Sequence, residues 1–113
     1  MFNTNHPPDQ KSESSALEAS RVASTQKTWL HGVFGRNGAV AQEIQIFDAA
    51  ALPANGTLTP LSLPVAANQW FAFTFGDGIP MANGVVVCNS TTANTKTIGA
   101  ADCTFVVVMR KKP

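Results

Sequence analysis

The sequence is poor in charged residues and contains only two cysteines. Asp, Glu, Lys and Arg make up 13% of its 113 residues, about half the usual fraction of a soluble domain, and the net charge is +1. This charge balance gives no reason to expect nucleic acid as a partner. Because so few charges oppose association, we expect part of the surface to be covered by a partner or by copies of the chain. The alternative is a neutral surface, rich in Thr, Asn and Gln, that is simply soluble.

The sequence also lacks a long apolar run. No stretch approaches the roughly 18 to 20 apolar residues that a membrane-spanning helix requires, so we expect no membrane partner. The N-terminus, MFNTNHPPDQKSESS, lacks the basic and then apolar order of a secretion signal. We therefore expect synthesis in the cytoplasm, with Cys88 and Cys103 as reduced, buried thiols. For the same reason we discount the glycosylation triplets at Asn55 and Asn89.

A chain of this length has room for one domain with one core, and its composition divides near residue 27. Residues 1–26 contain one Leu, one Val and one Phe, too little apolar surface to order an independent core. Residues 12–24 have a weak helical tendency with a thin apolar stripe, so an isolated helix would be marginal. We predict an N-terminal arm over residues 1–27, extended or partly helical, that anchors a β domain over residues 28–113.

In the remainder of the chain, apolar and polar residues alternate with period two, and turn residues separate the runs. The six predicted strands are 29–34, 42–47, 61–65, 69–75, 84–89 and 103–110, and a seventh is expected if residues 96–98 pair briefly. This pattern predicts an all-β fold, an antiparallel β-sandwich or jelly roll of about six to eight strands.

Three details of these runs predict where they lie in the fold. Phe71, Phe73 and Phe75 share one face, which we predict to be core. Pro60 and Pro64 lack a backbone N–H, which places the run around them at a sheet edge. The last run is apolar on both faces, which indicates a central strand or one whose outer face meets another subunit.

The residue types that form metal or nucleophilic sites are few. Cys88 and Cys103 lie on the strands that flank a polar loop; they are neighbours if those strands pair, but the sequence leaves the register open. A zinc site would need both cysteines with His6 and His31, without any of the usual close ligand spacings. A nucleophilic pair of a cysteine with His31 is the alternative, but a cysteine in an apolar strand is usually an inert small hydrophobe. We predict no metal site and no catalytic cysteine.

The carboxylates, glycines and cations give no stronger signal. Asp77 and Asp102 lie beside small residues, where aspartate serves turns, and nothing predicts the fixed separation across a cleft that glycoside hydrolysis needs. The glycines match neither the Gly-x-x-x-x-Gly-Lys nor the Gly-x-Gly-x-x-Gly phosphate-binding pattern. The cations at 110–112 could contact phosphates, but such a run is more often a solvated tail. We predict no catalytic, cofactor-binding or metal-binding residue, no small-molecule substrate and no enzymatic activity.

Several stretches taken together resemble a known type of domain. They are "LHGVFGRNG", "QIFD", "LPANG", "PVAANQWFAFTFG", "NGVVVCNSTT" and "TIGAADCTFVV", spread over roughly residues 29–108. These stretches are similar to the β-sandwich or jelly-roll module of structural proteins in tailed bacteriophages. The motifs consist mainly of turn and core residues, so the resemblance implies a scaffold and brings no catalytic residues with it.

The resemblance implies a structural protein of the virion, made in the host cytoplasm, and first of all a decoration (cement) protein on the capsid exterior. Such a protein would contact the major capsid protein or other virion proteins and would form a homo-oligomer, with a trimer favoured. Two alternatives stay open. One is a neck or tail component, and the other is a carbohydrate- or receptor-binding sandwich with Trp29, Trp70 and the loop 90–96 as a stacking platform.

Overall fold

Eight strands and no helix make up the regular structure of residues 10–111, the part of the chain that the computed structural model describes. The strands are β1 (Gln10–Glu13), β2 (Ser20–Ser24), β3 (Thr28–Arg36), β4 (Gln42–Phe47), β5 (Leu61–Val65), β6 (Trp70–Met81), β7 (Val85–Ser90) and β8 (Thr104–Lys111). The prediction of an all-β fold is confirmed. Residues 96–98 pair only briefly, through an isolated bridge between Ile98 and Ser90, and add no seventh strand to the six that we predicted.

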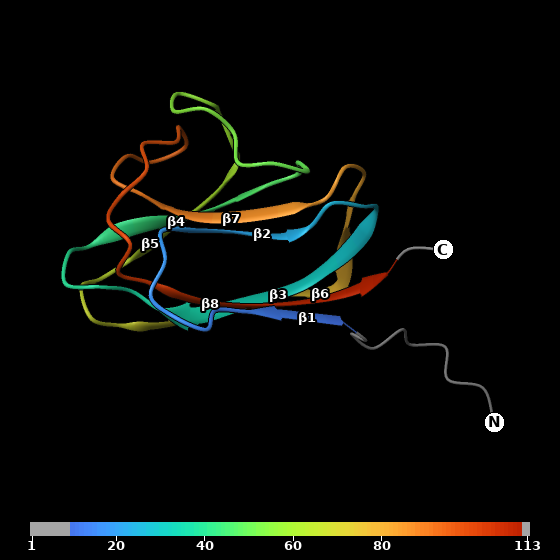
Figure 1. The fold of residues 1–113 in the computed structure, drawn as a ribbon, viewed down its shortest axis with the longest axis horizontal. Coiled ribbons are helices and arrows are strands. Elements are labelled where there is room, and N and C mark those ends of the chain that lie inside the picture. The colour runs from blue at the N-terminus through green and yellow to red at the C-terminus, as the bar shows by residue number, and fades with distance from the viewer. Residues whose placement is uncertain (1–9, 112–113) are drawn as a thin grey trace.

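The strands form two antiparallel four-stranded sheets that pack as two layers, as Figure 1 shows. The first sheet has the order β1-β8-β3-β6 and the second has the order β2-β7-β4-β5. β8 is therefore a central strand, one of the two alternatives that its two apolar faces predicted. β5 lies at a sheet edge, as its prolines predicted. Only β4 and β5 are consecutive strands of one sheet, so nearly every connection crosses from one layer to the other.

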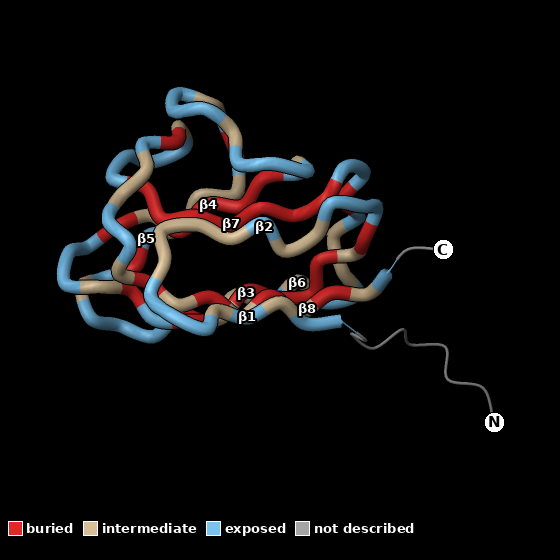
Figure 2. Tube along the Cα trace, in the orientation of Figure 1, coloured by how far each residue is buried: buried red, intermediate tan, exposed pale blue. Residues whose placement is uncertain are grey.

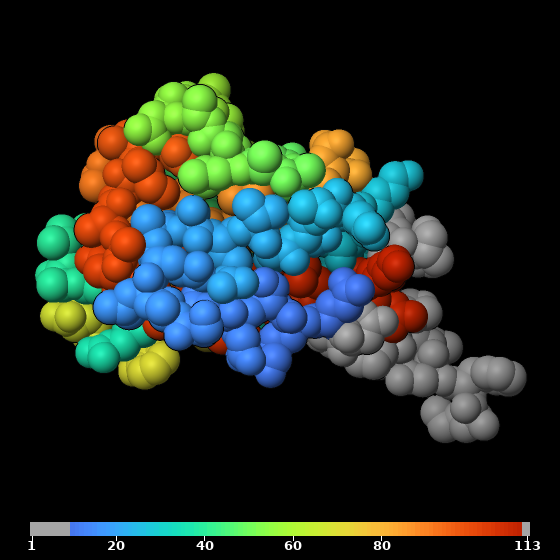
Figure 3. Space-filling model, viewed as in Figure 1, coloured from blue at the N-terminus to red at the C-terminus, as the bar shows by residue number. Residues whose placement is uncertain are grey.

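Residues 10–24 are built into the sandwich and do not form a separate arm. β1 pairs with β8, and β2 pairs with β7, so the segment supplies an edge strand to each sheet. Between the two strands, the backbone of Glu18 forms a bridge with Cys103. In the space-filling view of Figure 3, the blue N-terminal segment lies across the front of the molecule, over the boundary between the layers.

The partly helical alternative for residues 12–24 is wrong over this stretch. Its thin apolar stripe gives a helix little to bury, whereas the open edges of β7 and β8 offer backbone hydrogen bonds to an extended chain. Arg21 strengthens the extended form, because its Nε lies 2.6 Å from Glu18 Oε2 and its Nη1 donates to Ser12 Oγ at 3.1 Å. Residues 1–9 of the predicted arm lie outside the described residues.

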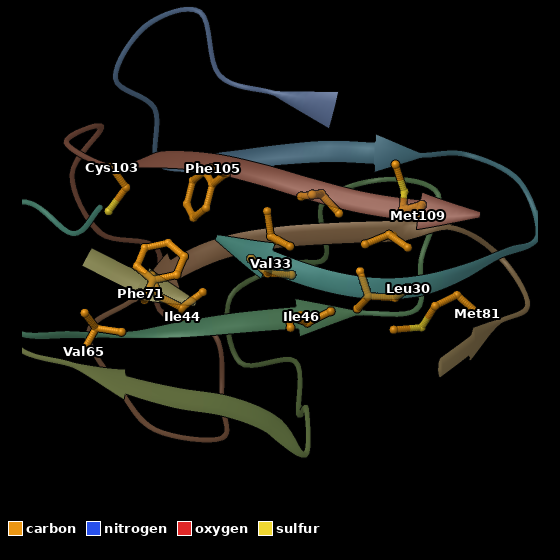
Figure 4. Packing of buried hydrophobic residues seen from close by; sticks show 13 residues of the cluster. Leu30, Val33, Ile44, Ile46, Val65, Phe71, Met81, Cys103, Phe105 and Met109 are labelled. Carbon is orange, nitrogen blue, oxygen red and sulfur yellow. The ribbon is translucent and has the colours of Figure 1, made fainter. Parts of the chain in front are cut away.

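The core fills the space between the two sheets, where buried positions line both layers in Figure 2. Its main cluster draws on both sheets, as Figure 4 shows for Leu30, Ile44 and Phe105. Of the phenylalanines predicted to share a core face, Phe71 is buried, while Phe73 and Phe75 are partly buried and pack against the cluster. The orientation of that face is confirmed, and its burial decreases along β6.

β6 is longer than the strand predicted there, because a bulge carries it past residue 75. Residues 75–78 lie opposite His31 of β3, and regular pairing resumes at Ile79. Gly76 and Gly78 have φ angles of +52° and +103°, which glycine adopts without the strain that a side chain would add. The stretch around Asp77, where we expected the aspartate to serve a turn, therefore forms a bulge within one long edge strand.

Candidate functional site

The two thiols, whose register the sequence left open, lie on opposite sheets. Cys88 is in β7 and Cys103 directly precedes β8, and these two strands do not pair. Both thiols are buried and free. Cys103 belongs to the main core between the sheets, whereas Cys88 belongs to a separate apolar cluster. The strands that flank the polar loop thus bring the two cysteines to different places.

Cys103 lies in a buried polar cluster with Asn37, Gln42, Asn89 and Asp102. Its Sγ donates to Asn37 Oδ1 at 3.5 Å, and Asn89 Nδ2 donates to the sulfur at 3.4 Å. Burial raises the pKa of the Cys103 thiol, against the opposing effect of the Asn89 hydrogen bond. The thiol is therefore protonated at neutral pH and is a poor nucleophile.

The polar cluster fastens one end of the sandwich. Asn37 Nδ2 donates to three backbone carbonyls in and beside the β3–β4 and β5–β6 connections, at 2.9, 3.1 and 3.2 Å. Asn37 Oδ1 accepts from the backbone N–H of Gly38 and from Gln42 Nε2, at 2.8 and 2.9 Å. Asn89 Nδ2 donates to the carbonyl of Ala100 in the β7–β8 connection, at 2.7 Å. Three connections are thus held by amide side chains, which indicates a structural role.

Cys88 has an apolar environment. It lies in a cluster with Val86 of the same strand and Phe47 of β4. Ala49 and Ile98, from the loops that follow β4 and β7, pack against this cluster. Burial raises the pKa of Cys88 to about 11, although the charge of Lys96 acts in the opposite direction. This thiol is also protonated at neutral pH.

His31, Asp77 and Asp102 are not brought together in one cluster. His31 is buried opposite the 75–78 bulge, which contains Asp77, while Asp102 lies in the polar cluster near the other end of the first sheet. Among residues 10–111, no three His, Cys, Asp or Glu side chains come together where a metal could bind, and no helix could cross a membrane. His6 and Lys112 lie outside that range.

Two loops, residues 48–60 and 91–102, fold over the outer face of the second sheet (Figure 1). Gln45, which is fully buried on this face, donates from Nε2 to two carbonyls of the second loop at 2.9 and 3.1 Å. Lys96 is only 3% exposed, and its Nζ donates to Asn55 Oδ1 of the first loop at 2.7 Å. The loops are therefore fixed to the sheet and to each other, and they cover the centre of this face, while Val22 at the β2 edge is 44% exposed.

The outer face of the first sheet has no comparable cover within residues 10–111, and we call it the open face (Figure 1). The strand registers place the following outward residues on it: Lys11, Glu13, Trp29, Gly32, Phe34, Arg36, Trp70, Ala72, Thr74, Pro80, Thr104, Val106, Val108 and Arg110. Its centre is apolar, since Phe34, Val106 and Val108 are only partly buried and Ala72 is exposed. The sandwich thus has one face whose centre is covered by loops and one open face with an apolar centre.

The tryptophans lie on the open face but toward opposite ends of it. Trp70 pairs with Arg36, and Trp29 pairs with Pro80, while the loop 90–96 lies over the other sheet. The three parts of the predicted stacking platform are therefore not assembled into one site. Each tryptophan borders a shallow hollow of its own: that of Trp70, which is 75% exposed, has about 350 Å³, and that of Trp29 has about 300 Å³. The Arg36 guanidinium lies 5.7 Å from the centroid of the Trp70 ring.

Comparison with protein-family models, with curated proteins and with solved structures gives no match to this chain.

Proposed function

We propose that this protein is a structural component of a tailed bacteriophage particle, a decoration protein that binds the capsid exterior and reinforces the shell. The proposal assigns it no catalytic activity. Reinforcement of this kind needs a rigid module with surface to spare for protein contacts, repeated many times over the shell. Each copy then buries surface across subunit boundaries, for which specific interfaces use about 1,000 Å² or more.

The observation that carries the proposal is the combination of the strand order with an open face that has an apolar centre. The order β1-β8-β3-β6 facing β2-β7-β4-β5 matches that of an eight-stranded jelly roll, an architecture common in viral capsid domains. The centre of one outer face is covered by the chain's own loops, while the other face leaves Phe34, Val106 and Val108 at its centre partly accessible. An accessible apolar sheet face is typical of proteins that associate.

The chemistry of the buried groups agrees with a structural role. Both thiols are protonated and enclosed, and the amide side chains around Cys103 hold connections together. The resemblance in sequence noted above supplies the class of particle. The earlier expectation that residues 1–27 anchor the protein stays a proposal, but residues 10–24 now also have a part in the fold.

The test is the number of copies per particle. Quantitative mass spectrometry of purified particles should find this protein at a copy number comparable to that of the major capsid protein. Recombinant protein should also co-sediment with particles that lack it and raise their resistance to heat. A copy number of about a dozen or fewer would favour a neck or tail component, and absence from particles would refute the proposal.

The carbohydrate-binding alternative has one observation in its favour, the hollow beside Trp70. An exposed indole next to the Asn68 and Asp102 side chains offers a stacking surface with polar groups at its rim. Glycan-array binding that is lost in Trp70→Ala, with particle binding unchanged, would support this second function.

A further inference from the structure

The residues of the open face form four rows that run across the strands. The strand registers align residues from neighbouring strands side by side, so each row joins β8 to β3 and β6, and the two middle rows also include β1. In order along β8, the rows are Thr104–Arg36–Trp70, then Glu13–Val106–Phe34–Ala72, then Lys11–Val108–Gly32–Thr74, then Arg110–Trp29–Pro80.

The two middle rows are complementary to each other. At one edge an acid, Glu13, stands in one row and a base, Lys11, in the next, with both side chains more than half exposed. Along β8 each row carries a valine. On β6 each row carries a small residue. When the row of Glu13 in one copy lies over the row of Lys11 in another copy, opposite charges therefore face each other and apolar residues face apolar residues.

At the middle of the face, Gly32 leaves room for the ring of Phe34. A Cβ at this position would lie 2.8 Å from that ring. The missing side chain lets the Phe34 ring lie over the strand between the two middle rows. The aromatic ring thus occupies the point about which the two rows are related.

We propose that a second copy of this chain packs open face to open face. The two copies are related by a two-fold axis that is parallel to the rows and lies between the two middle rows. This operation places Glu13 over Lys11 of the second copy, and Val106 over Val108 of the second copy. The two Phe34 rings meet on the axis, where offset stacking is favourable. The interface is isologous, as a two-fold axis requires.

The outer rows fit the same operation. Trp70 of one copy comes over Pro80 of the other, an aromatic ring against a proline ring. At the β1 edge, Lys11 and Glu13 already form an ion pair within one chain, at 3.6 Å. In the dimer these two pairs become a cluster of four alternating charges. The large exposed indole and the bare apolar centre of the sheet are both covered.

The size of the face indicates a reversible dimer. Six residue steps along β8 and three strand spacings give a backbone footprint of about 20 by 15 Å, about 300 Å² per copy, which is smaller than the contact of a standard specific complex. We therefore expect the dimer to dissociate on dilution. A two-fold pairing differs from the trimer favoured at the sequence level, because the rows are related by a two-fold operation and not by a three-fold one.

The test is the association state of the purified full chain, followed by sedimentation equilibrium over a series of concentrations. The wild type should fit a monomer–dimer equilibrium. Val108→Lys should weaken dimerisation at least tenfold, because it places an unpaired charge in the interface of each copy. Leu58→Lys is the matched control: Leu58 is 75% exposed on the loop that covers the opposite sheet, and this change should leave the dissociation constant unchanged.

The charge cluster gives a second test that does not depend on the apolar centre of the face. Lys11→Glu alone puts four acids together across the axis and should weaken the dimer severalfold, while the double exchange Lys11→Glu with Glu13→Lys should restore it. A protein that is monomeric at every concentration, a trimeric mass, or a double exchange that fails to restore the dimer would each overturn the proposal. The measurement uses no particles, so its failure and a failure of the decoration function are distinguishable.

Discussion

Replacement of Asn37 by Asp, a change of nearly constant shape, tests the idea that the polar cluster holds the sandwich together. Asn37 is 2% exposed, and its Nδ2 faces three backbone carbonyls at 2.9, 3.1 and 3.2 Å. In the Asp variant, a negatively charged oxygen would replace the Nδ2 donor and would repel these carbonyl oxygens. It would also lie beside Asp102, whose carboxylate is in the same cluster. The isosteric change should therefore be worse than truncation to Ala.

The magnitude follows from the bonds that are lost. The amide N–H groups are shared among three carbonyls, and the amide oxygen accepts from the Gly38 N–H and Gln42 Nε2, so Asn37→Ala leaves all of these groups without this partner, which costs about 2 to 4 kcal/mol. Asn37→Asp adds a buried, unpaired charge, which brings the loss to about 4 to 6 kcal/mol at neutral pH. Domains of this size are stable by only about 5 to 15 kcal/mol, and 1 kcal/mol shifts the melting temperature by roughly 4 °C. The Ala variant should thus melt roughly 8 to 16 °C below the wild type, and the Asp variant lower still.

The pH dependence separates charge from shape. A protonated carboxyl can donate again, so the folded Asp variant binds its proton more tightly than the unfolded chain does, and its stability should rise as the pH falls. Urea denaturation of the wild type and both variants, at pH 7 and at about pH 4.5, near the ordinary carboxyl range, measures this. The gap between Asn37→Asp and the wild type should narrow at the lower pH. An Asp variant as stable as the Ala variant at pH 7, or a gap independent of pH, would refute the reasoning.

Three further predictions concern the edge strands, the core and the thiols. Removal of residues 1–24 should abolish cooperative unfolding in circular dichroism, because β7 and β8 each lose an edge partner; a truncated chain that still folds would restore the separate arm. Phe105→Ala, at a fully buried position, should cost about 3 to 5 kcal/mol in urea denaturation, whereas Phe73→Ala, partly buried on an edge strand, should cost less than half as much. Equal losses would contradict the burial gradient. Cys103→Ser should be nearly neutral in the same assay, since a hydroxyl can use the amide partners, while Cys88→Ser should cost about 1 to 3 kcal/mol, and a reductant should leave the wild-type melting temperature unchanged. Burial raises the pKa of Cys88 from 9.0 to about 11, so the folded chain holds the thiol proton more tightly than the unfolded chain does. The resulting contribution to the free energy of unfolding is complete below pH 9 and should be lost as the pH rises toward 11. Cys88→Ala should not show this loss.

The sequence predicts strands well where one face is apolar and the other polar. β4 and the first half of β6 alternate clearly and were placed to within a residue or two. β1 and β2 gave no such signal, because the edge strand QKSE is polar on both faces and SRVAS is nearly so. Their stability comes from backbone pairing with β8 and β7, which are far away in the sequence and invisible to a local pattern.

The polar cluster could not be predicted for a related reason. Buried amides look like surface amides in a sequence, and Asn37, Gln42 and Asn89 come together only because three connections meet at one end of the sandwich. The distance between the cysteines depends on which strands pair. Because β7 and β8 belong to different sheets, the two thiols lie apart. The apolar outer side of β8 was visible in advance, and it is the part of the open face that the sequence could indicate.

The pairing of the earliest strands with the latest has a consequence for how the chain folds. β1 and β2 pair only with β8 and β7, so neither early strand has a sheet partner until nearly the whole domain has been synthesised. Contacts between such distant segments carry a large loop-closure cost, which slows folding of β-rich domains to milliseconds or seconds. During that interval the Val-rich β7 and β8 would present bare edges to other nascent chains. The early segment is polar and rich in Ser, and such a composition lowers its tendency to form incorrect strand pairs before β7 and β8 have been synthesised.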